Sequence, residues 1–75
     1  MIYISISQNE TSIILDCHKK TKDGAYFRLV IERMTRRVIE RPDNLDADVS
    51  AAYAHVYRLL KNNEPLPAET VAAWG

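Results

Sequence analysis

The sequence is poor in cysteine and glycine. Its single cysteine, Cys17, excludes an intramolecular disulfide framework. Its two glycines, Gly24 and Gly75, are too far apart to form a glycine-rich loop that binds phosphate. No apolar run approaches the roughly 18 residues that cross a bilayer, and no basic stretch precedes an apolar segment near Met1. We therefore expect a cytoplasmic protein with no membrane association.

Residues for catalysis are also scarce. Cys17 and His18 are adjacent, but neighbouring residues of a strand point to opposite faces, so these two are not expected to act together as nucleophile and base. The other histidine, His55, lies beside an apolar stripe in a different segment. We expect a protein that is not an enzyme and that uses no cofactor, metal ion or small-molecule ligand.

The charge is balanced overall but unevenly distributed. Ten basic and ten acidic residues give a net charge of zero, and 47% of the 75 residues are hydrophobic, as in a single globular domain spanning 1–75. Residues 1–41 hold eight Lys or Arg against five acids, whereas 42–75 hold two against five. A net charge of zero argues against a general polyanion binder. Whether the basic residues form a binding site then depends on where they lie relative to one another.

Two segments near the N-terminus have apolar residues at every second position. The first contributes Ile2, Ile4 and Ile6, and the second contributes Ile13, Leu15 and Cys17. A period of two with β-branched residues predicts half-buried strands. The polar residues 8–10 lie between the segments and predict a turn, so we expect an antiparallel pair.

The segment from Ala25 to Arg41 fits two interpretations. Its apolar spacing also matches a helix over 26–40. However, the tetrapeptide Val-Ile-Glu-Arg occurs at 30–33 and again at 38–41, with a connection of hairpin length between the copies. This repeat favours two strands around a turn, and Pro42 ends the sheet because proline cannot donate a ladder hydrogen bond.

A helix is predicted over 46–62. Apolar residues follow its 3, 4 spacing: Val49, Ala52, Tyr53, Val56, Leu59 and Leu60. Asp46 is a suitable N-cap, and the two asparagines before Pro65 are a suitable end. A second, short helix is predicted over 67–74, with Pro67 in its first turn and Val71 and Trp74 on one face.

These elements together predict an α+β domain. A four-stranded antiparallel β-meander over 1–41 should pack against the main helix, followed by the short helical tail. The side chains expected between sheet and helix are Ile4, Ile6, Ile13, Leu15, Phe27, Leu29 and Ile31 from the strands, and Val49, Ala52, Tyr53, Val56 and Leu60 from the helix.

The same alternation places other residues on the second face of the sheet. A partner-binding surface is expected there, consisting of Tyr3, Ile14, Tyr26, Arg28 and Val30, with Ser5 and His18 nearby. An equally weighted alternative is that the tail folds back and covers Ile14 or Val30 with Val71 or Trp74. We expect the face, or a sheet edge, to bind a protein partner or a second copy of the chain.

Nucleic-acid binding is the alternative function. A meander gathers basic residues at one end of its sheet, and the candidates for phosphate contacts are Lys19, Lys20, Lys22, Arg28 and Arg41. Three further arginines, at positions 33, 36 and 37, are expected at the opposite end. Zero net charge and the acidic C-terminal third make this the second choice after protein binding.

Overall fold

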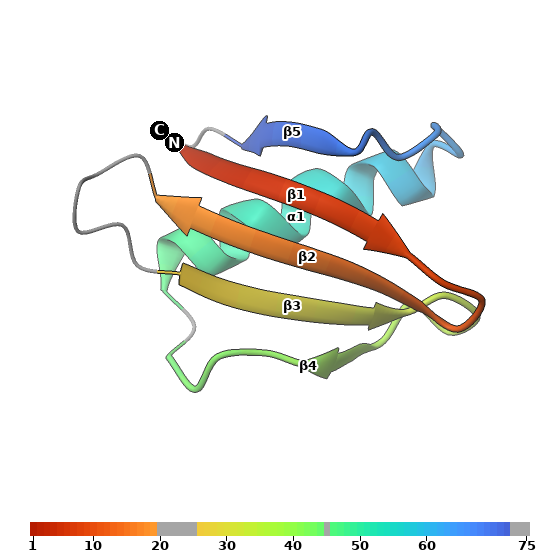
Figure 1. The fold of residues 1–75 in the computed structure, drawn as a ribbon, viewed down its shortest axis with the longest axis horizontal. Helices are drawn as coiled ribbons and strands as arrows, with labels where there is room; N and C mark the ends of the chain where they lie inside the picture. The colour runs from red at the N-terminus through yellow and green to blue at the C-terminus, as the bar shows by residue number, and fades with distance from the viewer. Residues whose placement is uncertain (20–25, 45, 73–75) are drawn as a thin grey trace.

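One helix packs against one face of a five-stranded antiparallel sheet in the computed structural model, which describes residues 1–19, 26–44 and 46–72 (Figure 1). The elements are β1 (Ile2–Gln8), β2 (Ser12–Lys19), β3 (Tyr26–Glu32), β4 (Val38–Glu40), α1 (Ala47–Lys61) and β5 (Glu69–Ala72). The strand order is β4-β3-β2-β1-β5, and every neighbouring pair is antiparallel. The α+β class and the meander of the first four strands are confirmed.

A side-chain acceptor closes the turn between β1 and β2. The Asn9 side-chain oxygen accepts hydrogen bonds from the backbone N–H groups of Thr11 at 2.9 Å and Ser12 at 2.7 Å. Asparagine favours such turns because its side chain replaces a backbone acceptor. The predicted antiparallel pairing of the first two strands is confirmed, with Ile4 opposite Cys17.

The hairpin interpretation of residues 26–40 is also confirmed, and the helical alternative is wrong. β3 pairs with β4, although β4 has only three residues and the register shifts between Val30 and Ile31. Arg36 in the connecting turn has φ 61°, a left-handed conformation that glycine or asparagine adopts more readily. Its N–H donates to the Glu32 carbonyl at 2.7 Å, and this bond closes the turn.

The main helix begins and ends close to the predicted residues. Asp46 is the N-cap, and its carboxylate accepts a hydrogen bond from the Val49 N–H at 3.0 Å. At the other end Asn63 is left-handed, with φ 55°. The N–H of Glu64 donates to the Leu59 carbonyl and that of Asn63 to the Leu60 carbonyl, the pattern of a Schellman cap.

The predicted helical tail is wrong, because residues 69–72 form β5 instead. This strand pairs with β1, so that Val71 lies opposite Tyr3 and Ala72 opposite Ile2. A helix of seven or eight residues is unstable alone, whereas the free edge of β1 supplies backbone partners to an extended chain. Val71 therefore lies at the sheet edge, and Trp74 lies outside the described residues.

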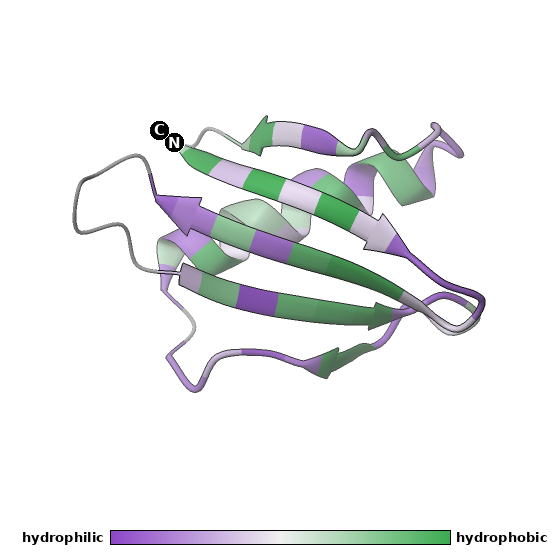
Figure 2. Cartoon of the chain, in the orientation of Figure 1, coloured by the Kyte–Doolittle hydropathy of each residue, from purple (hydrophilic) through white to green (hydrophobic). Residues whose placement is uncertain are grey.

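The core lies between the sheet and α1. Every strand residue expected there is buried, as are Val49, Ala52 and Val56 of the helix, while Tyr53 and Leu60 are partly buried against them. Figure 2 shows the alternating hydropathy along β1 that produces this arrangement. Cys17 is fully buried, and desolvation raises the pKa of its thiol to about 12, so the thiol is un-ionised at neutral pH.

Candidate interaction surface

The second face of the sheet, here called the open face, is uncovered by any described element. In Figure 1 the helix lies behind the sheet, and no described part of the chain crosses in front of the strands. The five residues expected to bind a partner, Tyr3, Ile14, Tyr26, Arg28 and Val30, all lie on this face. The alternative in which Val71 covers Ile14 or Val30 is wrong, because Val71 is fixed beside Tyr3 in β5.

One row of side chains runs across four strands of the open face. Tyr26 of β3 lies opposite His18 of β2, His18 opposite Tyr3 of β1, and Tyr3 opposite Val71 of β5. The rings of Tyr3 and His18 are stacked, with centroids 5.3 Å apart and planes 21° apart. Tyr26 is 60% exposed and Val71 is 41% exposed. This aromatic row presents large ring surfaces to solvent.

A charged pair lies directly beside the aromatic row. The Arg28 Nε donates to the Asp16 carboxylate at 2.9 Å, and the Tyr26 hydroxyl donates to the same oxygen. These two hydrogen bonds, first from Tyr26 and then from Arg28, lower the pKa of Asp16. The bond to Asp16 also raises the pKa of Tyr26. The network holds the Tyr26 ring and the Arg28 guanidinium in fixed positions on the surface.

An aliphatic pair completes the centre of the open face. Val30 of β3 lies opposite Ile14 of β2, and both are half-buried. Ser7 follows on β1 and Glu40 on β4. Large apolar side chains are unusual on a sheet face that only contacts water, so this pair extends the apolar area beyond the aromatic row.

A pocket of about 400 Å³ lies along the edge between β1 and β5. Its walls include the rings of Tyr3 and His18 and the side chains of Glu69 and Val71. On the helix side of β5, the Thr70 hydroxyl is 2.9 Å from a ring nitrogen of His55 in α1. This contact joins β5 to the helix. The pocket is therefore built on a strand that is attached to both the sheet and the helix.

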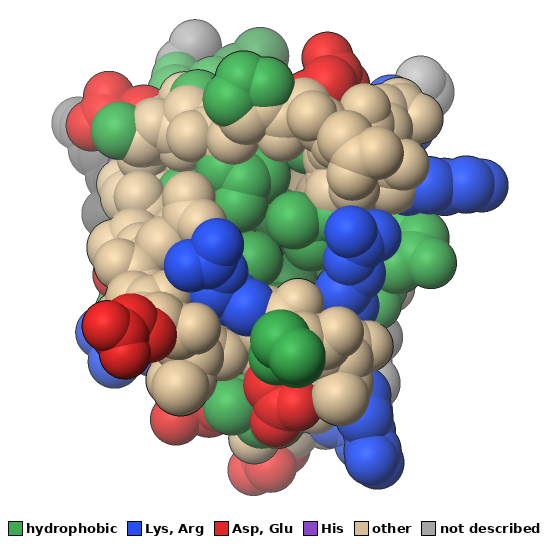
Figure 3. All heavy atoms as spheres, turned by 90° about the vertical axis from the view of Figure 1, so that its right-hand side faces the viewer, with side chains coloured by type: hydrophobic (Ala, Val, Ile, Leu, Met, Phe, Trp, Pro, Cys, Tyr) green, Lys and Arg blue, Asp and Glu red, His purple; other side chains and the backbone are tan. Residues whose placement is uncertain are grey.

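Two basic residues of the β3–β4 turn lie at another site. Arg33 and Arg36 border a hollow formed with the C-terminal end of α1. Figure 3 shows basic side chains on both sides of this hollow and a hydrophobic floor between them. This group is distinct from the open face.

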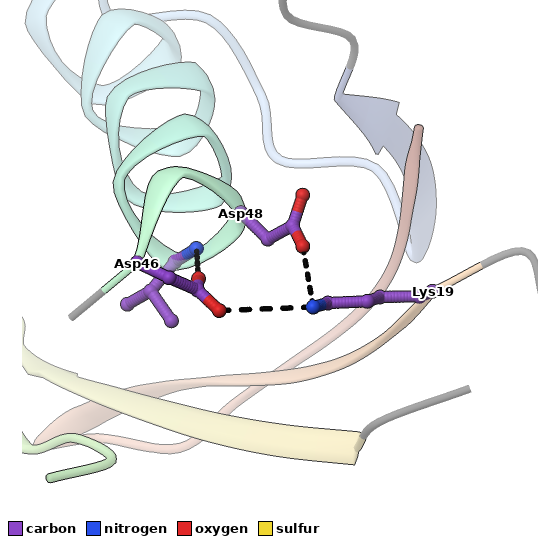
Figure 4. A network of polar contacts seen from close by, with 4 residues as sticks. Lys19, Asp46 and Asp48 are labelled. Carbon is purple, nitrogen blue, oxygen red and sulfur yellow. Dashed lines mark hydrogen bonds and ion pairs between the residues drawn. The ribbon is translucent and has the colours of Figure 1, made fainter. Parts of the chain in front are cut away.

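Three of the five residues predicted to contact phosphate, Lys19, Arg28 and Arg41, are described by the structure, and it does not bring these three together. Lys19 lies opposite the buried Ile2, and thus on the helix side of the sheet. Its Nζ is 2.6 Å from Asp48 and 3.6 Å from Asp46 (Figure 4). The hydrogen bond to Asp48 is the main cause that raises the pKa of Lys19. Lys19 therefore forms ion pairs with acidic residues at the start of α1.

Arg28 and Arg41 are also separated from each other. Arg28 is on the open face and is paired with Asp16. Arg41 lines a small pocket on the helix side, beside Tyr53. Lys20 and Lys22 lie outside the described residues. The described residues of the expected basic end are thus divided between two faces of the sheet, and Lys19 and Arg28 are each paired with acidic side chains.

Asp16 is a functional candidate that the sequence analysis did not single out, and His18 was expected near the partner-binding surface but not among its residues. Both owe their position to strand register, because Asp16 lies opposite Arg28 and His18 opposite Tyr26. These pairings follow from the register of the β2–β3 pair. The register depends on the length and shape of the turn that joins the two strands, which the sequence pattern does not fix.

Comparison with known proteins identifies no relative: no protein-family model, curated protein or solved structure matches the chain. Within residues 1–19, 26–44 and 46–72, no three His, Cys, Asp or Glu side chains are grouped so that they could hold a metal ion. None of the helical segments described is long and apolar enough to cross a membrane.

Proposed function

We propose that this protein is a small, non-catalytic interaction module that binds another protein chain through its open face. The supporting observation is the aromatic row, in which Tyr26, His18, Tyr3 and Val71 lie side by side on a face that no described element covers. Aromatic residues and arginine are the side chains most enriched at energetically important positions of protein interfaces.

The hydrogen bonds to Asp16 favour this role because they hold the side chains of Tyr26 and Arg28 in position before a partner binds. Tyr26 and Arg28 are both bonded to Asp16, so their side chains lose less rotamer freedom when a partner binds. Ile14 and Val30 lie next to them and supply an aliphatic centre. The combination of fixed aromatic anchors and an apolar centre resembles the composition of a protein-binding surface.

A second copy of the chain is one such partner, and β5 offers a further contact for it. The Ile6 N–H donates to the Ala68 carbonyl, and antiparallel pairs alternate between bonded and non-bonded positions. The N–H and C=O groups of Glu69 and Val71 therefore point away from β1. Such an edge can accept another strand, and a domain of this size gains stability from association.

The charges of the open face support a protein partner over a nucleic acid. Its basic residue, Arg28, is paired with Asp16, while Glu32 and Glu69 lie on the same face. Phosphate contacts supply most of the affinity for nucleic acids, and among the described residues this face offers no excess positive charge for them.

The test is a double substitution, Tyr26→Ala with Val30→Ser, measured by sedimentation at two protein concentrations and by binding to any partner found. Association should be lost while the fold is kept, because interface anchors carry most of the binding energy. Tyr57→Ala on the outer side of α1, where Tyr57 is 42% exposed, is the control and should leave association unchanged.

Titration with single-stranded and duplex oligonucleotides at two salt concentrations tests the alternative function, nucleic-acid binding. Salt-dependent binding that requires Arg28 would support nucleic-acid recognition. A monomer that ignores both oligonucleotides would leave a foreign protein as the partner, and equal loss of association in both variants would contradict the open-face proposal.

A further inference from the structure

A hollow of about 440 Å³ lies where the β1–β2 and β3–β4 turns meet the C-terminal end of α1 (Figure 3). This volume is within the range of small-ligand sites. The hollow is lined at its floor by Ile13, Leu60 and Leu66, and at its rim by Arg33 and Arg36. It combines an apolar surface with two guanidinium groups.

The floor is a continuation of the hydrophobic core. Ile13 is 2% exposed and belongs to the core itself, whereas Leu60 and Leu66 are partly buried against it. The two leucines therefore keep some exposed surface, and both line the hollow. An apolar group that fills the space would remove this surface from water, which favours binding.

Arg33 is held in place on the rim by two hydrogen bonds to the β1–β2 turn. Its backbone N–H donates to the Thr11 carbonyl at 3.0 Å, and its Nη1 donates to the Asn9 carbonyl at 3.0 Å. A guanidinium has five N–H donors, so this contact fixes the group while leaving donors for a ligand.

Arg36 occupies the rim at a cost to the backbone. Its φ of 61° is left-handed, a conformation that is unfavourable for a residue with a Cβ. Within the described residues its side chain has no hydrogen bond or ion pair that would offset this cost. Unfavourable backbone conformations of this kind are often retained at binding sites.

We propose that this hollow binds an aliphatic carboxylate, with the carboxylate on Arg33 and Arg36 and the aliphatic group over Leu60 and Leu66. Guanidinium groups match carboxylates in charge and geometry. The one acid on the rim, Glu64, is outnumbered by the two arginines. The carboxylate belongs to a free acid or to the C-terminal residue of a peptide.

The test is a titration followed by NMR of the side-chain methyl groups. Octanoate below its micelle concentration should shift the methyls of Ile13, Leu60 and Leu66 saturably, and octanol should bind at least tenfold more weakly. Acetyl-Gly-Gly-Leu with a free carboxylate, compared with its amide, identifies a peptide terminus as the source. Failure of both carboxylates to shift these methyls would overturn the proposal.

Two charge-matched substitutions locate the interaction. Arg36→Gln should weaken octanoate binding about tenfold, the effect of losing one charge-assisted contact. Arg58→Gln removes the same charge from an exposed position of α1 and should have no effect. Glu64→Gln should strengthen binding at least twofold. Equal affinity for octanol and octanoate, or equal losses in the two arginine variants, would contradict the proposal without bearing on the open face.

Discussion

Lys19 and Asp48 join the end of β2 to the first turn of α1, with Nζ and Oδ2 2.6 Å apart. The contact links the sheet to the N-terminal end of the helix (Figure 4). Asp48 also lies near the positive end of the helix dipole. Lys19 is thus a structural residue in this protein, although its sequence position suggested a phosphate ligand.

Lys19→Gln is expected to lower the melting temperature at neutral pH. Because the ion pair raises the pKa of Lys19 in the folded state, its stabilising effect is complete below the unfolded pKa of about 10.4 and is lost as the pH rises through the folded value. Melting curves between pH 7 and pH 11 should show the two proteins converging at the alkaline end. Arg37→Gln, at an exposed turn position, is the control and should show no such convergence.

Asp16→Asn tests the network on the open face. The pKa of Asp16 is lowered in the folded state, so its contribution is present above the unfolded pKa of about 3.9 and is lost as the pH falls through the folded value. The loss for this solvent-exposed network should be below about 1 kcal/mol at pH 7. Urea unfolding at pH 7 and pH 2.5 measures it, and a difference that persists unchanged at pH 2.5 would argue against a role for the carboxylate charge.

Val56→Asp is expected to unfold the domain. Val56 is fully buried on the face of α1 that contacts the sheet, and an unpaired buried charge costs several kcal/mol by rough estimate, comparable to the stability of a small domain. Circular dichroism should show loss of the cooperative transition. Tyr57→Asp, at the next and exposed position, should still melt cooperatively; matching behaviour of the two variants would mean that this helix face is not the core.

Arg36→Gly should make the protein more stable while weakening its interaction with a carboxylate. Glycine adopts φ near 60° without a Cβ clash, so the free energy of unfolding should rise by about 1 kcal/mol, or roughly 4–8 °C in melting temperature. Arg37→Gly has no such conformational gain, because Arg37 is not left-handed. An Arg36→Gly variant no more stable than Arg37→Gly would show that the turn carries no strain.

Local patterns in the sequence were sufficient for the parts of the fold that depend on near neighbours. The alternation in β1 and β2, the repeat around Met34 and the apolar stripe of α1 each predicted an element that is present. The five proposed partner-binding residues also share one face, since strand alternation fixes which side each occupies. What the sequence could not supply was register, which places Asp16 against Arg28 and His18 between two tyrosines.

The tail was predicted incorrectly for a related reason. Residues 67–74 have the proline and the apolar spacing of a short helix, but Thr70 and Val71 are β-branched and fit a strand equally well. The deciding factor is the unpaired edge of β1, which is far away in the sequence. A segment this short adopts the conformation that its tertiary partner offers.

The orientation of β5 gives a final prediction, based on two neighbouring proline substitutions. Ala68 bonds to Ile6, and bonded pairs recur at every second position, so the Thr70 N–H points toward Ile4 and the Val71 N–H points outward. Thr70→Pro removes a hydrogen bond inside the sheet and should lower the free energy of unfolding by about 1–3 kcal/mol. Val71→Pro removes only an outward N–H and should cost clearly less.

The same pair of variants distinguishes the edge of the sheet from its open face. If copies of the chain associate by pairing their β5 strands, Val71→Pro should weaken association strongly, because it removes one of the two outward N–H donors, those of Glu69 and Val71. If they associate through the open face alone, Val71→Pro should associate nearly as well as the unmodified chain, while Tyr26→Ala with Val30→Ser should not associate. Sedimentation of both variants measures this, with urea unfolding to check that each is folded. Equal destabilisation by Thr70→Pro and Val71→Pro would contradict the strand orientation on which both expectations depend.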